Sequence, residues 1–157
     1  MTQIVPFESE HCIVRMRPDA EERKTERRSR IATEAAKQCG RGRLPSVSST
    51  VSFDQMLQQA KMADIVLFCY EGKNTMPLRA LLQKKRADGM FPESTPPHIA
   101  VVIGSEGGFS PREAEMAEQN GFCMTGLGSR ILRTETASTF VLSNLVYEFE
   151  LSSTCPC

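Results

Sequence analysis

The chain has 157 residues, of which 24% are charged and 40% hydrophobic, and its 19 basic and 19 acidic residues leave no net charge. This length favours one globular domain, and the composition excludes the disordered and fibrous classes. No apolar run approaches the ~20 residues of a membrane span, and the N-terminus does not read as a leader peptide. We therefore expect a cytoplasmic protein without a membrane partner.

The charges are unevenly distributed along the chain. Residues 21–43 hold eight Lys or Arg and four Asp or Glu, whereas residues 93–157 hold three and eight. The basic stretch could face an anionic partner such as RNA. Judged by charge alone, a solvated helix face is the better interpretation.

The cysteines do not have the spacing of a disulfide framework, and we expect reduced thiols. A metal or redox role is conceivable for the tail Cys155-Pro-Cys157. The two histidines, His11 and His98, belong to no ligand-like cluster, so we predict no metal site. The six cysteines are Cys12, Cys39, Cys69, Cys123, Cys155 and Cys157.

The first third of the chain predicts two short strands and a long helix. The β-prone runs are 3–7 and 11–16, and the helix is expected over 20–39 with Asp19 as its N-cap and Gly40 as its end. Its apolar positions follow helical spacing and are Ile31, Ala35, Ala36 and Cys39. Residues 41–47 are expected to form a loop.

The middle of the chain predicts a helix, a buried strand and a second helix. Ser52 and Gln55 form a capping-box pattern that opens a helix through about Met62. Residues 64–71 are apolar without polar alternation, which indicates a strand covered on both faces. A helix over 76–87 and a Pro- and Gly-rich loop over 88–98 follow.

The last third gives the clearest pattern. A buried strand over 98–104 precedes a glycine-rich turn, and Ser110, Pro111 and Glu113 supply the N-cap, first-turn proline and capping-box glutamate of a helix that Gly121 ends. A strand over 122–127 follows. The final helix carries an apolar stripe of Ala137, Phe140, Val141, Leu145, Val146 and Phe149.

Strands that alternate with helices predict an α/β fold with a mostly parallel sheet flanked by helices. Ligands of such sheets bind beyond the carboxyl ends of the strands. Three loops are expected there, 70–75, 104–110 and 126–136, and we predict that they share a small-molecule pocket. Glycines at 104, 107 and 108 allow close backbone approach, but the phosphate-loop and dinucleotide patterns are absent.

The segments "IGSEGGFSPREAEMAEQNGF" and "LGSRILRTETAS", with "EAAKQCGR" upstream, resemble RsmE-type small-subunit ribosomal RNA (uracil-N3) methyltransferases of the SPOUT, or α/β-knot, class. The resemblance spans residues 4–151 and is densest over 99–138. It implies a C-terminal deep trefoil knot, S-adenosylmethionine as methyl donor, a homodimer, and a uridine of 16S rRNA in the small ribosomal subunit as acceptor. Ser105 stands where the family usually has proline.

Compared with the family, residues 1–151 correspond to the methyltransferase domain without its first strand and helix, and 152–157 form a tail. The family's N-terminal barrel domain, which binds RNA, is absent from this sequence. An alternative function is therefore a catalytically incomplete knot module that binds RNA or the ribosome. A SPOUT methyltransferase acting on another RNA is a third possibility.

The resemblance also assigns roles to residues of the three loops. The residues that would bind the donor, largely through backbone groups, are Ile103, Gly104, Gly108, Leu127, Gly128, Ile131 and Leu132. Ile131 and Leu132 would also supply apolar walls. Ordinary core packing is an equal alternative for Leu127 and Leu132.

The catalytic candidates are two arginines and two glutamates. Methylation of a uracil nitrogen removes its proton, and Arg130 or Arg133 could stabilise the charge that develops on the base. Glu106 or Glu135 could accept the proton, although Glu135 could instead interact with a helix dipole. The ring nitrogen itself attacks, so the reaction needs no cysteine nucleophile.

Three upstream residues match the family's "EAAKQCGR" segment: Glu34, Gln38 and Arg41. They could face the substrate RNA or the dimer partner. The alternative is an exposed helix end, which we favour slightly for Gln38. In the context of the resemblance, the basic stretch becomes a candidate surface for phosphate contacts.

Overall fold

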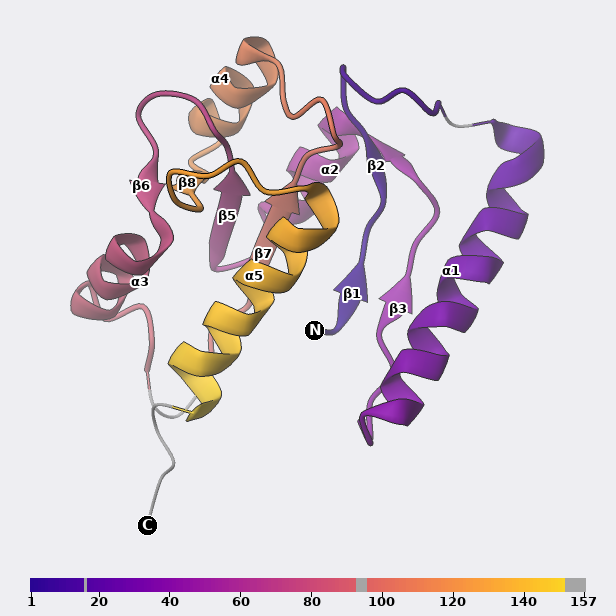
Figure 1. Ribbon diagram of the computed structural model, residues 1–157, viewed down its shortest axis with the longest axis horizontal. Coiled ribbons are helices and arrows are strands. Elements are labelled where there is room, and N and C mark those ends of the chain that lie inside the picture. Colours follow the sequence, from indigo (N-terminus) through magenta and orange to yellow (C-terminus); the bar gives the residue numbers. More distant parts are fainter. Residues whose placement is uncertain (16, 93–95, 152–157) are drawn as a thin grey trace.

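The computed structural model describes residues 1–15, 17–92 and 96–151 (Figure 1). Strands and helices alternate through most of this length. The elements in chain order are β1 (Gln3–Ile4), β2 (Phe7–Glu8), α1 (Pro18–Gln38), β3 (Ser46–Val47), β4 (Val51–Ser52), α2 (Phe53–Ala60), β5 (Ile65–Cys69), β6 (Met76–Pro77), α3 (Leu78–Ala87), β7 (Ile99–Ile103), α4 (Pro111–Gln119), β8 (Cys123–Gly126), α5 (Thr134–Val146) and a terminal π-helical turn η1 (Tyr147–Leu151).

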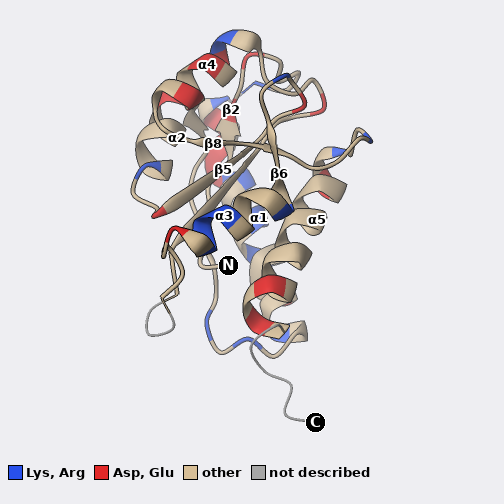
Figure 2. Ribbon diagram, turned by 90° about the vertical axis from the view of Figure 1, so that its left-hand side faces the viewer, with Lys and Arg blue, Asp and Glu red and all other residues tan. Residues whose placement is uncertain are grey.

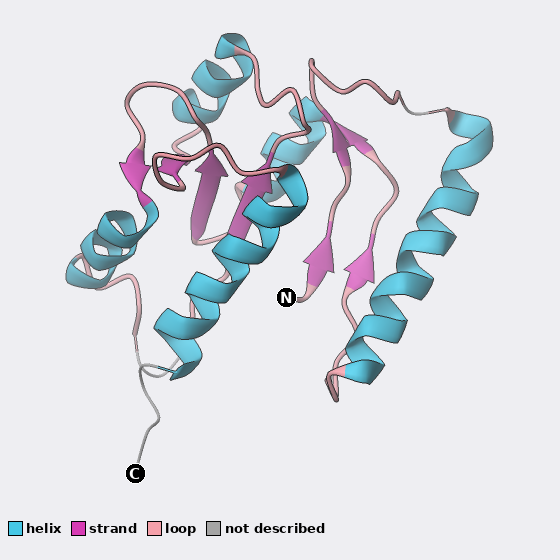
Figure 3. Cartoon of the chain, in the orientation of Figure 1, coloured by secondary structure: helices cyan, strands magenta, loops and turns pink. Residues whose placement is uncertain are grey.

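A four-stranded parallel sheet forms the centre of the molecule (Figure 3). Its strand order is β6-β8-β5-β7, and β5 pairs with β7 from Ile65↔Ile99 to Cys69↔Ile103. On its other side β5 pairs with β8 in parallel. The predicted α/β fold with a mostly parallel sheet is therefore confirmed.

Helices cover both faces of this sheet. Along β5 the side chains alternate, so Val66 and Phe68 belong to one apolar cluster while Ile65 and Leu67 belong to another. The first cluster includes residues of α2 and α4, and the second includes residues of α3 and α5. This three-layer arrangement explains why β5 lacks polar alternation, as the sequence predicted.

The N-terminal part of the chain forms two small parallel ribbons and a long helix. β1 pairs with β3, β2 pairs with β4, and each pair is two residues long. Helix α1 lies beside these ribbons, on the side away from the four-stranded sheet (Figure 1). Only Glu21 and Ala36 of α1 are buried.

The predicted strand over 11–16 is wrong within its described residues. The segment Ser9–Arg15 is a turn in which the Cys12 amide donates to the Ser9 carbonyl at 3.1 Å. The β-prone side chains Ile13 and Val14 are 88% and 74% exposed. Two β-prone residues form a strand only where a neighbouring strand offers backbone hydrogen bonds. No described strand pairs with Ile13 or Val14. Met16 lies outside the described residues.

Helix α1 differs from its prediction in its start and in its packing face. Its N-cap is Arg17, because Pro18 occupies the first turn with a helical φ, and Asp19 is a first-turn acid instead. The expected apolar face is mostly exposed: Ile31 is 59% exposed, and Ala36 is its one buried member. The end at Gly40 is confirmed, with a φ of +68°.

The sequence did not predict the three short strands β3, β4 and β6. Ser46–Val47 was expected to be loop and Met76–Pro77 to begin a helix, but β6 instead pairs with β8. Two-residue strands carry too little periodicity to be read from sequence. By contrast, both capping boxes are confirmed, Ser52 with Gln55 and Ser110 with Glu113.

Figure 2 marks the charged residues along the ribbon, including basic residues of α3 and acidic residues of α4. The last turn of α3 carries Lys84, Lys85 and Arg86, where cations are favourable. Helix α4 carries acidic residues, including Glu113 in its first turn. Among the described residues, no helix is both long and apolar enough to cross a bilayer.

The described cysteines are free thiols, as predicted, and are Cys12, Cys39, Cys69 and Cys123. Cys155 and Cys157 belong to the tail 152–157, which lies outside the described residues. Within the described part of the chain, no group of three or more His, Cys, Asp or Glu side chains could hold a metal ion. The trefoil knot stays a prediction from the resemblance.

Candidate functional site

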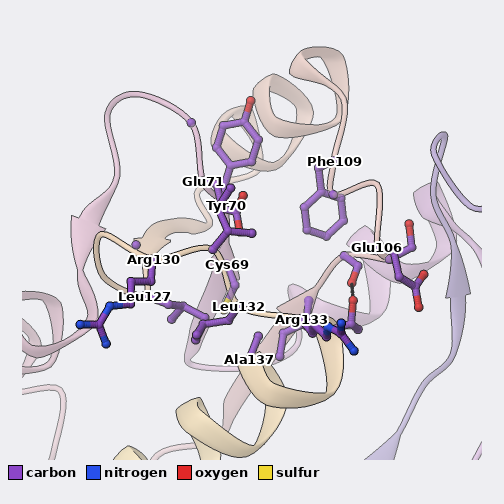
Figure 4. A pocket seen from close by; sticks show the side chains of 18 of the residues that line it. Cys69, Tyr70, Glu71, Glu106, Phe109, Leu127, Arg130, Leu132, Arg133 and Ala137 are labelled. Carbon is purple, nitrogen blue, oxygen red and sulfur yellow. Dashed lines mark hydrogen bonds between the residues drawn. The ribbon is translucent and has the colours of Figure 1, made fainter.

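The carboxyl ends of β5, β7 and β8 meet at one edge of the sheet. Cys69 at the end of β5 lies beside Ile103 of β7 and beside Thr125 of β8. The loops that follow these strands enclose a cavity of about 950 Å³ (Figure 4). The three loops predicted to share a pocket therefore do so.

Every candidate donor-binding residue lines this cavity, namely Ile103, Gly104, Gly108, Leu127, Gly128, Ile131 and Leu132. Ile131 lines the cavity with 82% of its surface exposed, and its role as an apolar wall stays a prediction. Leu132 is half-buried and Leu127 also packs against the α3–α5 cluster, so Leu127 combines cavity lining with core packing.

All four catalytic candidates also line the cavity: Glu106, Arg130, Arg133 and Glu135. Each of these side chains is exposed. Figure 4 shows Arg133 on the same side of the cavity as Glu106, whereas Arg130 lies on the opposite side, beside Leu127. Glu135 is in the first turn of α5, where the helix dipole favours an acid.

The three upstream candidates do not line the cavity. Glu34 and Gln38 are exposed residues near the C-terminal end of α1, and the exposed Arg41 follows the helix. Figure 1 shows this end of α1 distant from the loops of the cavity. Glu34 forms a 3.2 Å ion pair with Lys37, and Arg41 donates from Nη2 to the carbonyl of Met1 at 3.1 Å.

The glycine-rich loop, residues 104–109, is a tight turn anchored in the core. The Gly108 amide donates to the Ser105 carbonyl at 2.8 Å, and Gly108 has a φ of +65° that favours glycine. A Cβ on Gly104 would lie 3.2 Å from the backbone of Gly108, so a side chain would crowd the turn. Phe109 is buried against Phe68 at a ring-centroid distance of 4.2 Å.

Thr134 joins two loops of the site rather than capping α5. The N-cap of α5 is Arg133, and it makes no side-chain cap hydrogen bond. The Thr134 hydroxyl instead donates to the Gly104 carbonyl at 3.1 Å. A threonine at the first helical position can turn its hydroxyl away from the helix, and here it fixes the glycine-rich loop.

Sequence reasoning missed Cys69 and Ala137, which lie just outside the three predicted loops, and it gave no individual role to Tyr70 and Ser105 within them. The signal that could have identified Cys69 and Ala137 is their position. Cys69 is the last residue of β5, and Ala137 lies about one helical turn after Arg133. Burial raises the pKa of the Cys69 thiol to about 12. The thiol therefore stays protonated at neutral pH, as fits a site without a cysteine nucleophile.

The lining combines apolar surface with side chains of both charges, since Arg130 and Arg133 line the cavity together with glutamates. Leu127, Leu132 and Ala137 offer apolar surface, while Glu71 and Glu106 bring carboxylates to the mouth. The glycine-rich loop carries a glutamate and no lysine, which disfavours a phosphate.

Comparison with known proteins identifies relatives with similar sequences and folds. The sequence profile of the RNA methyltransferase domain family matches residues 1–146. Ribosomal RNA small subunit methyltransferase E of Bacillus subtilis is 35% identical over 148 residues, which are 94% of this chain and 56% of that protein.

Two solved structures share the fold. A Legionella pneumophila protein in complex with bound SAM superposes with a TM-score of 0.79 at 31% identity, over 94% of this chain and 55% of that one. Ribosomal RNA small subunit methyltransferase E from Neisseria gonorrhoeae bound to S-adenosyl methionine gives a TM-score of 0.74 at 26% identity, over 94% and 56%.

The chain thus spans little more than half the length of these relatives. The match nevertheless covers nearly all of the described structure, including every loop of the cavity. The resemblance seen in the sequence motifs is confirmed, and the chain belongs to the RNA methyltransferase domain family that contains the small-subunit ribosomal RNA methyltransferases E.

Proposed function

We propose that this chain binds S-adenosylmethionine and transfers its methyl group to N3 of a uridine in 16S rRNA of the small ribosomal subunit. The observation that carries the proposal is the cavity of about 950 Å³. Loops that are distant in sequence assemble it at the carboxyl edge of the sheet, and they contain the motifs of the resemblance. Similar proteins bound to SAM support the choice of donor.

The residues of the cavity fit this donor. Backbone groups of the two glycine-containing loops would hold its polar parts, and Leu127 and Leu132 would contact the adenine. The exposed carboxylates of Glu71 and Glu106 line the cavity and would complement the positive charge of the donor. When bound, the donor supplies an electrophilic methyl group on a positively charged sulfur.

The chain's own residues would orient the base and manage its proton. N3 would bond to the methyl carbon as the carbon–sulfur bond of the donor breaks, and it gives up its proton to a base. Negative charge develops on the uracil where proton loss runs ahead of methyl transfer. Arg133, on the Glu106 side of the cavity, would stabilise that charge, and Arg130 is the alternative. Glu106 or Glu135 would accept the proton. Holding both reactants in one cavity supplies much of the rate enhancement.

The proposed assembly is a homodimer with a knotted C-terminal part. Exposed apolar side chains on α5, Phe140, Leu142 and Val146, support an interface with another chain. Glu34, Gln38 and Arg41 would contact RNA or the dimer partner, together with the basic residues of α1. A ribosomal RNA substrate would place the reaction in the cytoplasm.

The test combines donor binding with methyl transfer. We expect saturable binding of S-adenosylmethionine in calorimetry and transfer of labelled methyl to N3 of one uridine in unmethylated small subunits. Arg133→Ala should lower the transfer rate by about 100-fold or more, the effect of removing one charge-stabilising donor, with donor affinity nearly unchanged.

Arg112→Ala is the matched control, because Arg112 is an exposed arginine on α4 outside the cavity. The control should retain the native rate. Failure of the native chain to bind the donor would refute the proposal. Donor binding without transfer to small subunits or other RNA would favour a module that has lost catalysis.

A further inference from the structure

The glycine-rich loop is contacted by a segment almost a hundred residues earlier in the chain. The Nδ1 atom of His11 lies 2.9 Å from the carbonyl oxygen of Gly107. A carbonyl oxygen can only accept, so Nδ1 carries the hydrogen and donates it. His11 therefore bonds a backbone group of a loop that lines the cavity.

Close packing accompanies this hydrogen bond. A Cβ on Gly107 would lie 2.7 Å from the Cβ of His11 and 3.2 Å from the His11 carbonyl oxygen. The two backbones thus approach closely only because residue 107 is glycine. The glycine at this position is explained by the contact with His11.

The segment that carries His11 is itself held in place. The Glu10 amide donates to Oε1 of Glu113 at 2.8 Å, and Oε2 of the same buried carboxylate accepts the Ser110 amide at 2.9 Å. Arg15 donates from Nη1 to the Ser9 carbonyl at 3.0 Å and from Nη2 to the Glu10 carbonyl at 2.8 Å. The imidazole is therefore presented from a fixed backbone.

Two carbonyl groups of the glycine-rich loop therefore accept hydrogen bonds from side chains in two different parts of the chain. Thr134 binds the carbonyl of Gly104, and His11 binds that of Gly107. Between these points lie Ser105 and Glu106, both of which line the cavity. The hydrogen bond from Thr134 arises from within the site, whereas the one from His11 reaches it from the N-terminal region.

We propose that His11 is a positioning residue of the donor pocket, which holds the backbone of residues 104–107 in the conformation that binds S-adenosylmethionine. This inference rests on the proposed function. Through it, the turn Ser9–Arg15 contributes to donor affinity without touching the donor.

Replacement of His11 tests the geometry of the hydrogen bond. His11→Ala should weaken donor binding by about threefold to tenfold, as expected for one lost hydrogen bond. His11→Asn should keep the native dissociation constant within about twofold, because the asparagine amide nitrogen can occupy the position of Nδ1. His11→Gln places its amide farther out and should resemble His11→Ala.

The matched control is His98→Ala, which removes an exposed histidine immediately before β7, at the opposite end of the strand from the glycine-rich loop. It should bind the donor as the native chain does. Hydrogen exchange of the amides of residues 107–109 should accelerate in His11→Ala and remain native in His11→Asn. Thermal unfolding checks that every variant is folded.

Native donor affinity in a folded His11→Ala variant would overturn the proposal, as would equal losses in the Asn and Gln variants. If the native chain itself does not bind the donor, the proposed function fails. In that case the exchange measurement still decides whether His11 fixes the loop.

Discussion

The four-stranded body and the N-terminal region, residues 1–52, are held together by different forces. In the body, Phe68 and Leu67 of the central strand are fully buried and helices cover both faces. In the N-terminal region the paired strands are two residues long, and a carboxylate is one of only two buried residues of the long helix.

That carboxylate, Glu21, organises the N-terminal region. It accepts hydrogen bonds from the Thr50 amide at 2.7 Å and the Thr50 hydroxyl at 2.6 Å, and it pairs with Arg28 at 3.1 Å. Apolar burial in the body is insensitive to pH, whereas this polar contact depends on an ionised group. The comparison teaches that apolar burial holds the body, whereas an ionised carboxylate joins α1 to Thr50 in the N-terminal region.

The largest expected effect comes from the body. Phe68→Ala removes a fully buried ring that contacts Phe109 beneath the glycine-rich loop, and should lower the free energy of unfolding by about 3–5 kcal/mol. Urea unfolding followed by circular dichroism measures the change. Met62→Ala, at a site 82% exposed, is the control and should change stability by less than about 0.5 kcal/mol. Equal effects would mean that the body is not held by this core.

A smaller effect is expected in the N-terminal region. The Thr50 hydroxyl, then its amide, and Arg28 lower the pKa of Glu21 from 4.5 to about 2, against the opposing effect of burial. Glu21→Gln should therefore lower the free energy of unfolding by roughly 2 kcal/mol at pH 7. Because the folded pKa is depressed, the native advantage is complete above about pH 4.5 and disappears as the pH falls towards 2.

Parallel unfolding curves of the native chain and the variant between pH 7 and 2 measure this difference. Glu22→Gln changes an exposed glutamate next to Glu21 and serves as the control. A difference between native chain and Glu21→Gln that stays constant from pH 7 to 2 would show that the ionised carboxylate is not what holds α1.

The smallest expected effect concerns a buried polar group of the body, the Ser105 hydroxyl. The Ser105 hydroxyl is buried without a hydrogen-bond partner among the described residues, which is unfavourable. Ser105→Ala should raise the free energy of unfolding by about 1 kcal/mol. Differential scanning calorimetry measures the gain, with exposed Ser129→Ala as the control. A destabilised Ser105→Ala variant would mean that the hydroxyl does have a partner.

Local patterns predicted the elements of the body well. The uninterrupted apolar run of β5 and the capping boxes at Ser52 and Ser110 depend on neighbours within a few residues, so the sequence displays them directly. Three loops at one edge of a parallel sheet then follow from topology. The residues of the cavity were predicted largely because two dense motifs occupy those loops.

The N-terminal region was predicted less well, because its structure depends on contacts distant in sequence. Ile13 and Val14 are β-prone but have no partner strand, and α1 buries Glu21 against Thr50 together with Ala36 while most of its apolar stripe stays exposed. The hydrogen bonds of Thr134 and His11 to the glycine-rich loop likewise join positions 30 and 96 residues apart.

By itself the sequence determined the parallel α/β body, the ends of its capped helices and the three loops that meet at a pocket. Periodicity, capping and glycine placement act over a few residues, so one chain suffices to read them. Only the tertiary structure decided which side chains reach the glycine-rich loop, that Ile131 faces solvent, and that a buried carboxylate holds α1. Those outcomes depend on which surfaces meet in space, and local patterns do not encode that.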